Sequence, residues 1–101
     1  MIRHTVVFRL KHPAGSAPER EFLAAAQEQL SSVPGVQAFE RLRQVSRKNA
    51  FRFGLSMEFA DQRAYDAYSN HPDHNRFVRE RWISEVEEFL EIDYEPYPGE
   101  A

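Results

Sequence analysis

Residues 51–59 read Phe-Arg-Phe-Gly-Leu-Ser-Met-Glu-Phe, and this stretch decides the fold. Large apolar side chains occupy every second position in it: Phe51, Phe53, Leu55, Met57 and Phe59. A period of two is typical of a β-strand that buries one face. We therefore predict a strand here and expect the other elements to pack around it.

On the N-terminal side of this strand, the sequence predicts a strand, a helix and a second strand. Ile2–Leu10 alternates in the same way and places on one face Ile2, His4, Val6, Phe8 and Leu10. Ser16 and Glu19 have the spacing of a capping box, so a helix should begin there and end at Pro34-Gly35. Val36–Val45 is the second predicted strand, joined to residues 51–59 by a turn.

On the C-terminal side, two helices and a last strand are predicted. Asp61 is expected to cap a helix that runs to about Asn70. Pro72 interrupts it, and Asp73 is expected to cap a short third helix. A strand from about Glu85 to Tyr94 closes the chain and places on one side Val86, Leu90, Ile92 and Tyr94.

The order of these elements is β-α-β-β-α-β, which is typical of an α+β, ferredoxin-like fold with a four-stranded antiparallel sheet. A length of 101 residues indicates one domain over 1–101, with the Pro-rich residues 96–101 as a flexible tail. Helices on one side of the sheet are expected to cover the apolar faces of the first and last strands.

The face of the sheet away from the helices is predicted to pack on a second copy of the chain. It mixes apolar and charged residues: Arg3, Thr5, Val7, Arg9, Phe39, Arg52, Ser56, Glu58, Phe89, Glu91 and Asp93. This mixture is too apolar for a plain solvated surface. The alternative is a monomer, because an antiparallel sheet tolerates one face in water.

Composition argues against several classes of protein. A net charge of −3 and a pI of about 5.8 do not fit a duplex-binding protein, so no nucleic-acid partner is expected. The chain has no cysteine and hence no disulfide or thiolate ligand. The start at Met1 lacks the apolar core of a signal peptide, and no apolar run is long enough to cross a bilayer. We therefore expect a cytoplasmic protein with no membrane partner.

Chemistry is most plausible around His4 and the segment from Tyr68 to His74. His4 lies on the helix-facing side of the first strand, where it could meet Tyr68 or His74 in the space between sheet and helices. An imidazole titrates near pH 6.5, about right for proton transfer, and a phenol is mainly a donor. The alternative is that these side chains cap helix ends and fill the core. A metal site of three histidines is not expected, and His12 is predicted to be solvated.

The chain resembles the stress-responsive A/B-barrel (Dabb) family over nearly its whole length. The resemblance is carried by Ile2–Lys11 (IRHTVVFRLK), by Tyr68–His74 (YSNHPDH) with Phe77 following, and by Ile92–Glu95 (IDYE). It implies a ferredoxin-like monomer and a homodimer in which two sheets form a barrel. The family includes a plant polyketide cyclase, olivetolic acid cyclase, which closes its substrate by aldol condensation without a cofactor.

For this chain the resemblance implies three catalytic residues: His74 and Tyr68 form the catalytic pair, and His4 orients the substrate or shares a hydrogen bond. No cofactor and no metal are expected. The expected ligand is a small, largely apolar molecule in contact with His71, Val6, Phe8, Phe22, Phe53, Leu55, Phe77 and Trp82. Two alternatives remain at this point: a non-catalytic stress-response or binding protein on the same dimer, and a cofactor-free monooxygenase. The residues leave open whether the chain is an enzyme; as one, it would be a cyclase-like lyase.

Overall fold

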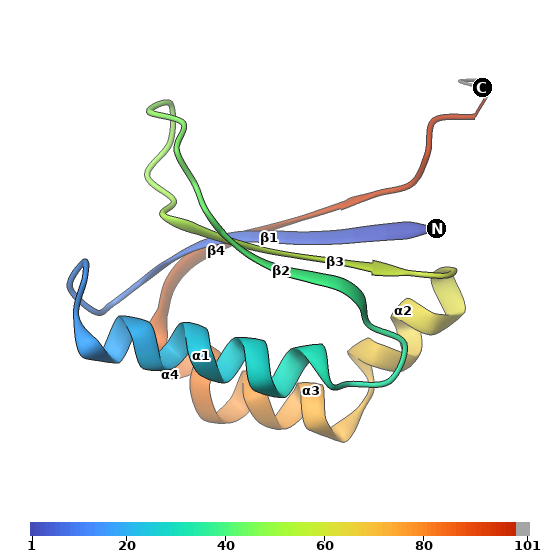
Figure 1. Ribbon diagram of the computed structural model, residues 1–101, viewed down its shortest axis with the longest axis horizontal. Coiled ribbons are helices and arrows are strands. Elements are labelled where there is room, and N and C mark those ends of the chain that lie inside the picture. The colour runs from blue at the N-terminus through green and yellow to red at the C-terminus, as the bar shows by residue number, and fades with distance from the viewer. Residues whose placement is uncertain (99–101) are drawn as a thin grey trace.

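The computed structural model describes residues 1–98 and has two layers, a sheet and a layer of helices on one of its faces (Figure 1). The strands are β1 (Ile2–Leu10), β2 (Gln37–Arg43), β3 (Phe53–Phe59) and β4 (Val86–Tyr94), and the helices are α1 (Ala17–Ser31), α2 (Gln62–Ser69), α3 (Pro72–Phe77), the π-helical turn η1 (Val78–Trp82) and α4 (Ile83–Glu85). The sheet order is β2-β3-β1-β4 with antiparallel pairing throughout. The predicted ferredoxin-like fold is confirmed. The predicted flexible tail, 96–101, lies partly outside the described residues.

Helix α1 begins where its capping box predicts. The Ser16 hydroxyl accepts a hydrogen bond from the Glu19 amide at 3.4 Å, and the Glu19 carboxylate accepts one from the Gly15 amide at 3.0 Å. These bonds satisfy donors that a helix start leaves unpaired. The helix ends at Ser31, and Gly35 turns the chain with a φ of +92°, which glycine adopts without strain.

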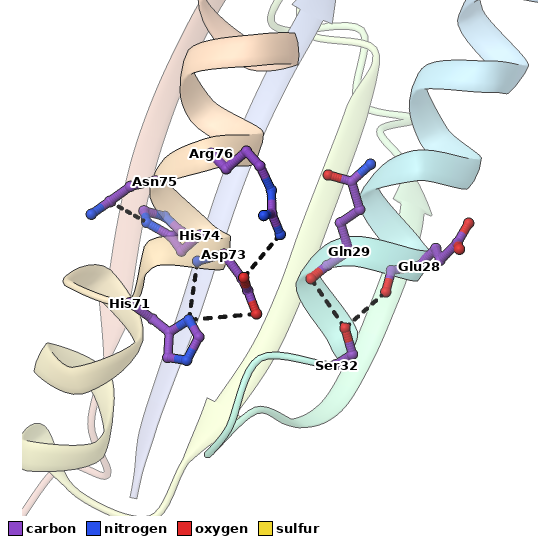
Figure 2. Close-up of polar contacts among 8 residues, drawn as sticks. All are labelled: Glu28, Gln29, Ser32, His71, Asp73, His74, Asn75 and Arg76. Carbon is purple, nitrogen blue, oxygen red and sulfur yellow. Dashed lines mark hydrogen bonds and ion pairs between the residues drawn. The ribbon is translucent and has the colours of Figure 1, made fainter.

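The third predicted helix differs in its start and its length. Its N-cap is His71, whose Nδ1 accepts from the Asp73 amide at 3.1 Å, and not Asp73 as the sequence pattern indicated (Figure 2). Pro72 explains the difference, because its fixed φ and missing N–H suit the first helical position and move the cap two residues earlier, to His71. The helical run then continues through η1, which holds the expected Val78 and Trp82, and through α4 to Glu85, three residues past Trp82.

The two central strands turn their large side chains toward the helices, as predicted. Directly opposed pairs on this covered face are His4 with Met57, Val6 with Leu55 and Phe8 with Phe53. Every one of these side chains is buried. Phe8 also packs on Phe22 of α1, with ring centroids 5.9 Å apart. The helix layer is therefore held to the sheet by aromatic packing.

The predicted facing of β4 is wrong for most of the strand. Phe89, Glu91 and Asp93 lie opposite Phe8, Val6 and His4, so they share the covered face. Leu90, Ile92 and Tyr94 lie opposite Val7, Thr5 and Arg3 on the open face. The cause is a bulge: Leu10 pairs with Val86 but Arg9 pairs with Glu88, which leaves Glu87 as an extra residue. One extra residue reverses the alternation of the rest of the strand.

The predicted placement of Phe39 on the open face is also wrong, because strand β2 contains a second irregularity. The register of β2 against β3 shifts between Gln37 and Glu40, where Ala38 has a φ of +51°. Phe39 consequently packs against the buried side chains of the covered face and not on the open one. Both mistaken placements arise where a bulge interrupts simple alternation.

Candidate functional site

A cavity of about 230 Å³ lies between the covered face of the sheet and the helix layer. Its wall is formed by His4, Val6, Leu30, Leu55, Met57, Tyr68, His74, Phe77, Val78, Trp82, Phe89 and Glu91. Most of these side chains are apolar, and the few polar groups converge on one hollow. That combination is typical of a small-molecule site.

Tyr68 and His74 form a ring pair in this wall. Tyr68 comes from α2 and exposes 2% of its surface, while His74 comes from the first turn of α3. Their ring centroids lie 4.6 Å apart. Burial raises the pKa of the Tyr68 phenol, and the negative charge of Glu91 adds to this. The phenol therefore keeps its proton at neutral pH and is suited to donate a hydrogen bond.

The contact of His74 with Asn75 uses one ring nitrogen, Nδ1, and does not involve the other, Nε2. Nδ1 lies 3.1 Å from the side-chain oxygen Oδ1 of Asn75 (Figure 2). An amide oxygen only accepts hydrogen bonds, so Nδ1 carries the imidazole proton in this contact. Nε2 then keeps its lone pair, which is the requirement for a general base.

His4 reaches the same cavity from β1, with its ring centroid 6.2 Å from that of Tyr68. Its Nδ1 lies 2.6 Å from Oδ1 of Asp93 and 3.0 Å from the Tyr65 hydroxyl. Tyr65 also donates to Oδ2 of Asp93 at 2.8 Å. Burial, followed by the hydrogen bond to Asp93, raises the pKa of the Tyr65 phenol.

The structure brings together His4, Tyr68 and His74, and it places in the same wall four of the predicted contact residues: Val6, Leu55, Phe77 and Trp82. The other four do not line the cavity. Phe8, Phe22 and Phe53 lie within the aromatic core beside it. His71 is turned to the start of α3, where its Nδ1 caps the helix and lies 3.7 Å from Asp73 (Figure 2).

Sequence reasoning missed part of the site. Leu30, Met57, Val78, Phe89 and Glu91 line the cavity, and Tyr65 and Asp93 hold His4. Phe89, Glu91 and Asp93 were expected on the open face because the bulge at Glu87 leaves no clear mark in the sequence. A usable signal did exist for Tyr65, which lies three residues before Tyr68 and hence on the same side of the helix.

The wall carries little charge and few candidate metal ligands. Among its described residues, Glu91 is the one with a formal charge at neutral pH. Within residues 1–98, no group of three or more His, Asp or Glu side chains is arranged to hold a metal ion. No helix of the same part of the chain is long and apolar enough to cross a membrane.

The arrangement has the chemical groups that proton transfer on a mostly apolar molecule requires. One imidazole and one phenol stand in contact, and the centroid of a second imidazole lies 6.2 Å from that of the phenol. A base beside a protonated donor suits the removal of a proton next to a carbonyl, because the donor stabilises the enolate oxygen that forms.

Comparison with solved structures supports the fold at two levels of similarity. A Dabb-family protein with a ferredoxin-like fold from Mesorhizobium loti is 59% identical, with 95% of this chain and 96% of that chain covered and a TM-score of 0.94. A hydroxynitrile lyase from Passiflora edulis is 16% identical, with 96% of both chains covered and a TM-score of 0.79. A dimeric ferredoxin-like protein of unknown function from Thermobifida fusca is 14% identical, with 94% and 90% covered and a TM-score of 0.75. The last two share the fold alone.

Sequence comparison identifies the family. No curated protein matches the chain significantly. The family model described as the stress-responsive A/B barrel domain, Dabb, matches residues 2–96. That match covers nearly all of the sequence, and the Mesorhizobium loti protein of the same family agrees with it in both sequence and fold. The chain belongs to the stress-responsive A/B barrel domain (Dabb) family.

Proposed function

We propose that this Dabb-domain protein binds a small, largely apolar carbonyl compound in the cavity and transfers protons on it without a cofactor, in the manner of an aldol cyclase. The observation that carries the proposal is the ring pair of Tyr68 and His74 in the wall of a mostly apolar hollow. A volume of about 230 Å³ lies just below the range of about 300–1,000 Å³ that is usual for drug-sized ligands, so the cavity suits a smaller molecule.

The proposed reaction needs two proton transfers, one hydrogen bond to the enolate oxygen and no change of oxidation state. Nε2 of His74 takes an acidic proton from the carbon beside a carbonyl, and the Tyr68 hydroxyl donates a hydrogen bond to the enolate oxygen. The enolate carbon attacks a second carbonyl of the same ligand and forms a carbon–carbon bond. The new alkoxide then takes the proton back from His74. The cavity wall holds the two reacting ends close together.

Hydrogen exchange on a simple ligand tests the proton-transfer step before the natural substrate is known. The probe is 4-phenylbutan-2-one in deuterated buffer, with incorporation of deuterium beside the carbonyl followed by NMR. The protein should speed exchange above the buffer rate, and His74→Ala should remove the gain while leaving the melting temperature nearly unchanged. Tyr68→Phe should lower the gain by about 100-fold, the low end of what an acid–base group contributes.

His71→Asn is the matched control, because it removes a histidine outside the cavity and leaves a residue that also caps helices well. Its exchange rate should equal that of the unmodified protein. Binding of the probe without faster exchange would favour the non-catalytic binding protein on the same site. Exchange that is unchanged in His74→Ala would contradict the assignment of His74.

We also propose that the protein is a homodimer joined through the open face of the sheet. This face carries four large, exposed apolar side chains: Leu42, Leu90, Ile92 and Tyr94. Such a patch is unusual for a monomer. The relative from Thermobifida fusca is a dimeric ferredoxin-like protein. Sedimentation of the full chain at micromolar concentration should give twice the mass of one chain.

A further inference from the structure

His4 has more hydrogen-bonding partners than a buried histidine needs to satisfy its ring nitrogen. It exposes 6% of its surface and lies on the central strand β1. Two side chains from different elements, Asp93 of β4 and Tyr65 of α2, both contact the same ring nitrogen, Nδ1. One partner would be enough to satisfy one polar atom.

The protons in this cluster have one consistent arrangement. An ionised carboxylate only accepts hydrogen bonds, so Asp93 donates none. Tyr65 keeps its phenol proton because its pKa is raised, and it donates that proton to Oδ2 of Asp93 at 2.8 Å. The contact of 2.6 Å between His4 Nδ1 and Oδ1 of Asp93 then contains the imidazole proton. His4 is therefore protonated on Nδ1 in its neutral form, and Nε2 carries the lone pair.

His4 is also part of the cavity wall. It lines the hollow together with Tyr68 and His74, and the centroid of the Tyr68 ring lies 6.2 Å from that of His4 and 4.6 Å from that of His74. Two imidazoles thus lie near one phenol in the same cavity wall. The resemblance to the family implied that His4 orients the substrate or shares a hydrogen bond, and this geometry also equips it for proton transfer.

We propose that Asp93 and Tyr65 are positioning residues that fix His4 in the Nδ1-protonated form, and that His4 is a second proton acceptor of the site. The use of His4 in turnover rests on the proposed function, whereas the protonation of its ring does not. In the reaction, His4 Nε2 takes the hydroxyl proton of a ligand that binds as its enol, and the enolate so formed attacks the second carbonyl. His4 then returns the proton to the new alkoxide, while Tyr68 keeps its own proton. No atom is gained or lost, and no oxidant or reductant is involved.

Nitrogen NMR of the full chain, with ¹⁵N-labelled histidine, tests the first half of the proposal. At a pH where histidines are neutral, Nδ1 of His4 should show the chemical shift of a protonated ring nitrogen and Nε2 that of an unprotonated one. Asp93→Asn should lower the Nδ1-protonated fraction of His4 at least about twofold, because an amide has no charge to favour that form. Tyr65→Phe should lower the Nδ1-protonated fraction of His4 by less than Asp93→Asn does, because the Asp93 carboxylate is still present.

Asp73→Asn is the matched control, because it makes the same chemical change next to His71 and away from His4. Its His4 signals should be unchanged. A wild-type His4 protonated on Nε2, or an Asp93→Asn variant with an unaltered His4, overturns the proposal whatever the protein does to ligands.

The deuterium exchange of 4-phenylbutan-2-one tests the second half. Asp93→Asn should slow the protein-dependent exchange at least about 10-fold, with no loss in Asp73→Asn. Suppose that Asp93→Asn shows the altered NMR signature but unchanged exchange, and that His74→Ala is inactive. This combination overturns the role of His4 in turnover and leaves the proposed function standing. Absence of exchange in the unmodified protein refutes the proposed function while the NMR result still decides the positioning of His4.

Discussion

The helices cover one face of the sheet, and on this face the side chains of β1 and β3 are aromatic or aliphatic and nearly all buried. The open face differs, because it carries ion pairs together with exposed apolar residues. Phe8 and Phe59 on the covered face have no exposed surface. On the open face, Ile92 is 38% exposed and Arg3 pairs with Glu58 at 2.8 Å. The covered face therefore stabilises one chain, and the open face is suited to hold a second.

The edge strand β4 contributes differently to the two faces. It places Glu91 in the cavity wall, Asp93 beside His4, and its aliphatic residues Leu90 and Ile92 on the open face. A plain amphipathic strand next to a helix layer would do the reverse. The arrangement teaches that β4 serves the site and the proposed interface, while β1 and β3 provide the core.

The largest effect on stability is expected from truncation of a buried side chain on the covered face. Phe8→Ala should lower the free energy of unfolding by about 3–5 kcal/mol, because a fully buried aromatic ring is lost and a cavity remains. Val45→Ala, at a position that is 81% exposed, is the control and should change it by less than about 0.5 kcal/mol. Urea unfolding measures both. Similar losses in the two variants would contradict the description of the core.

A charge on the open face should separate the proposed dimer. Ile92→Asp is expected to raise the dissociation constant at least about 100-fold, or about 2.7 kcal/mol, because the interface would bury an unpaired carboxylate. Ile83→Asp makes the same change at a residue that is 67% exposed and outside the sheet. Sedimentation over a range of concentrations should show dissociation in the first variant alone. Equal dissociation in both variants would point to another interface.

Alkaline pH should destabilise the covered face through its buried phenol. The pKa of Tyr68 is raised in the folded chain by burial and by Glu91, so the native state holds this proton at a pH where the unfolded chain has lost it. The resulting stability is complete below about pH 10 and decreases above it by about 1.4 kcal/mol per pH unit. Tyr68→Phe should remove this contribution and leave the smaller slope that Tyr65, whose pKa is also raised, still produces, whereas Tyr97→Phe, at an exposed position, should keep the full slope. An unchanged slope in Tyr68→Phe would show that other groups cause the loss.

The elements of the fold could be predicted because their signals are local. The alternation of Phe53–Phe59 and the caps at Ser16 and Asp61 each depend on residues close together in the chain. Their order was then enough to predict the ferredoxin-like topology, since few arrangements connect such elements.

The facing of β4 and the polar neighbours of His4 could not be predicted in the same way. A bulge changes the side-chain direction without changing the residue types around it, so alternation counted across Glu87 places Asp93 on the wrong face. The contact between His4 and Asp93 joins residues 89 positions apart and depends on strand register. Register follows from the packing of the whole sheet, which no short segment specifies.

Removal of the bulge is expected to have the smallest effect and tests this explanation most directly. Deletion of Glu87 leaves Val86 opposite Leu10, Glu88 opposite Arg9 and Phe89 opposite Phe8, which is a plain alternating strand in the existing register. Arg9 loses its contact with Glu87 at 3.2 Å and keeps the one with Glu88 at 2.7 Å, an exchange worth less than about 1 kcal/mol at the surface. The NMR signature of His4 beside Asp93 should therefore survive the deletion, and the urea midpoint should move little. Loss of that signature would mean that the bulge itself sets the register of β4, and that the covered face alone does not hold Asp93 beside His4.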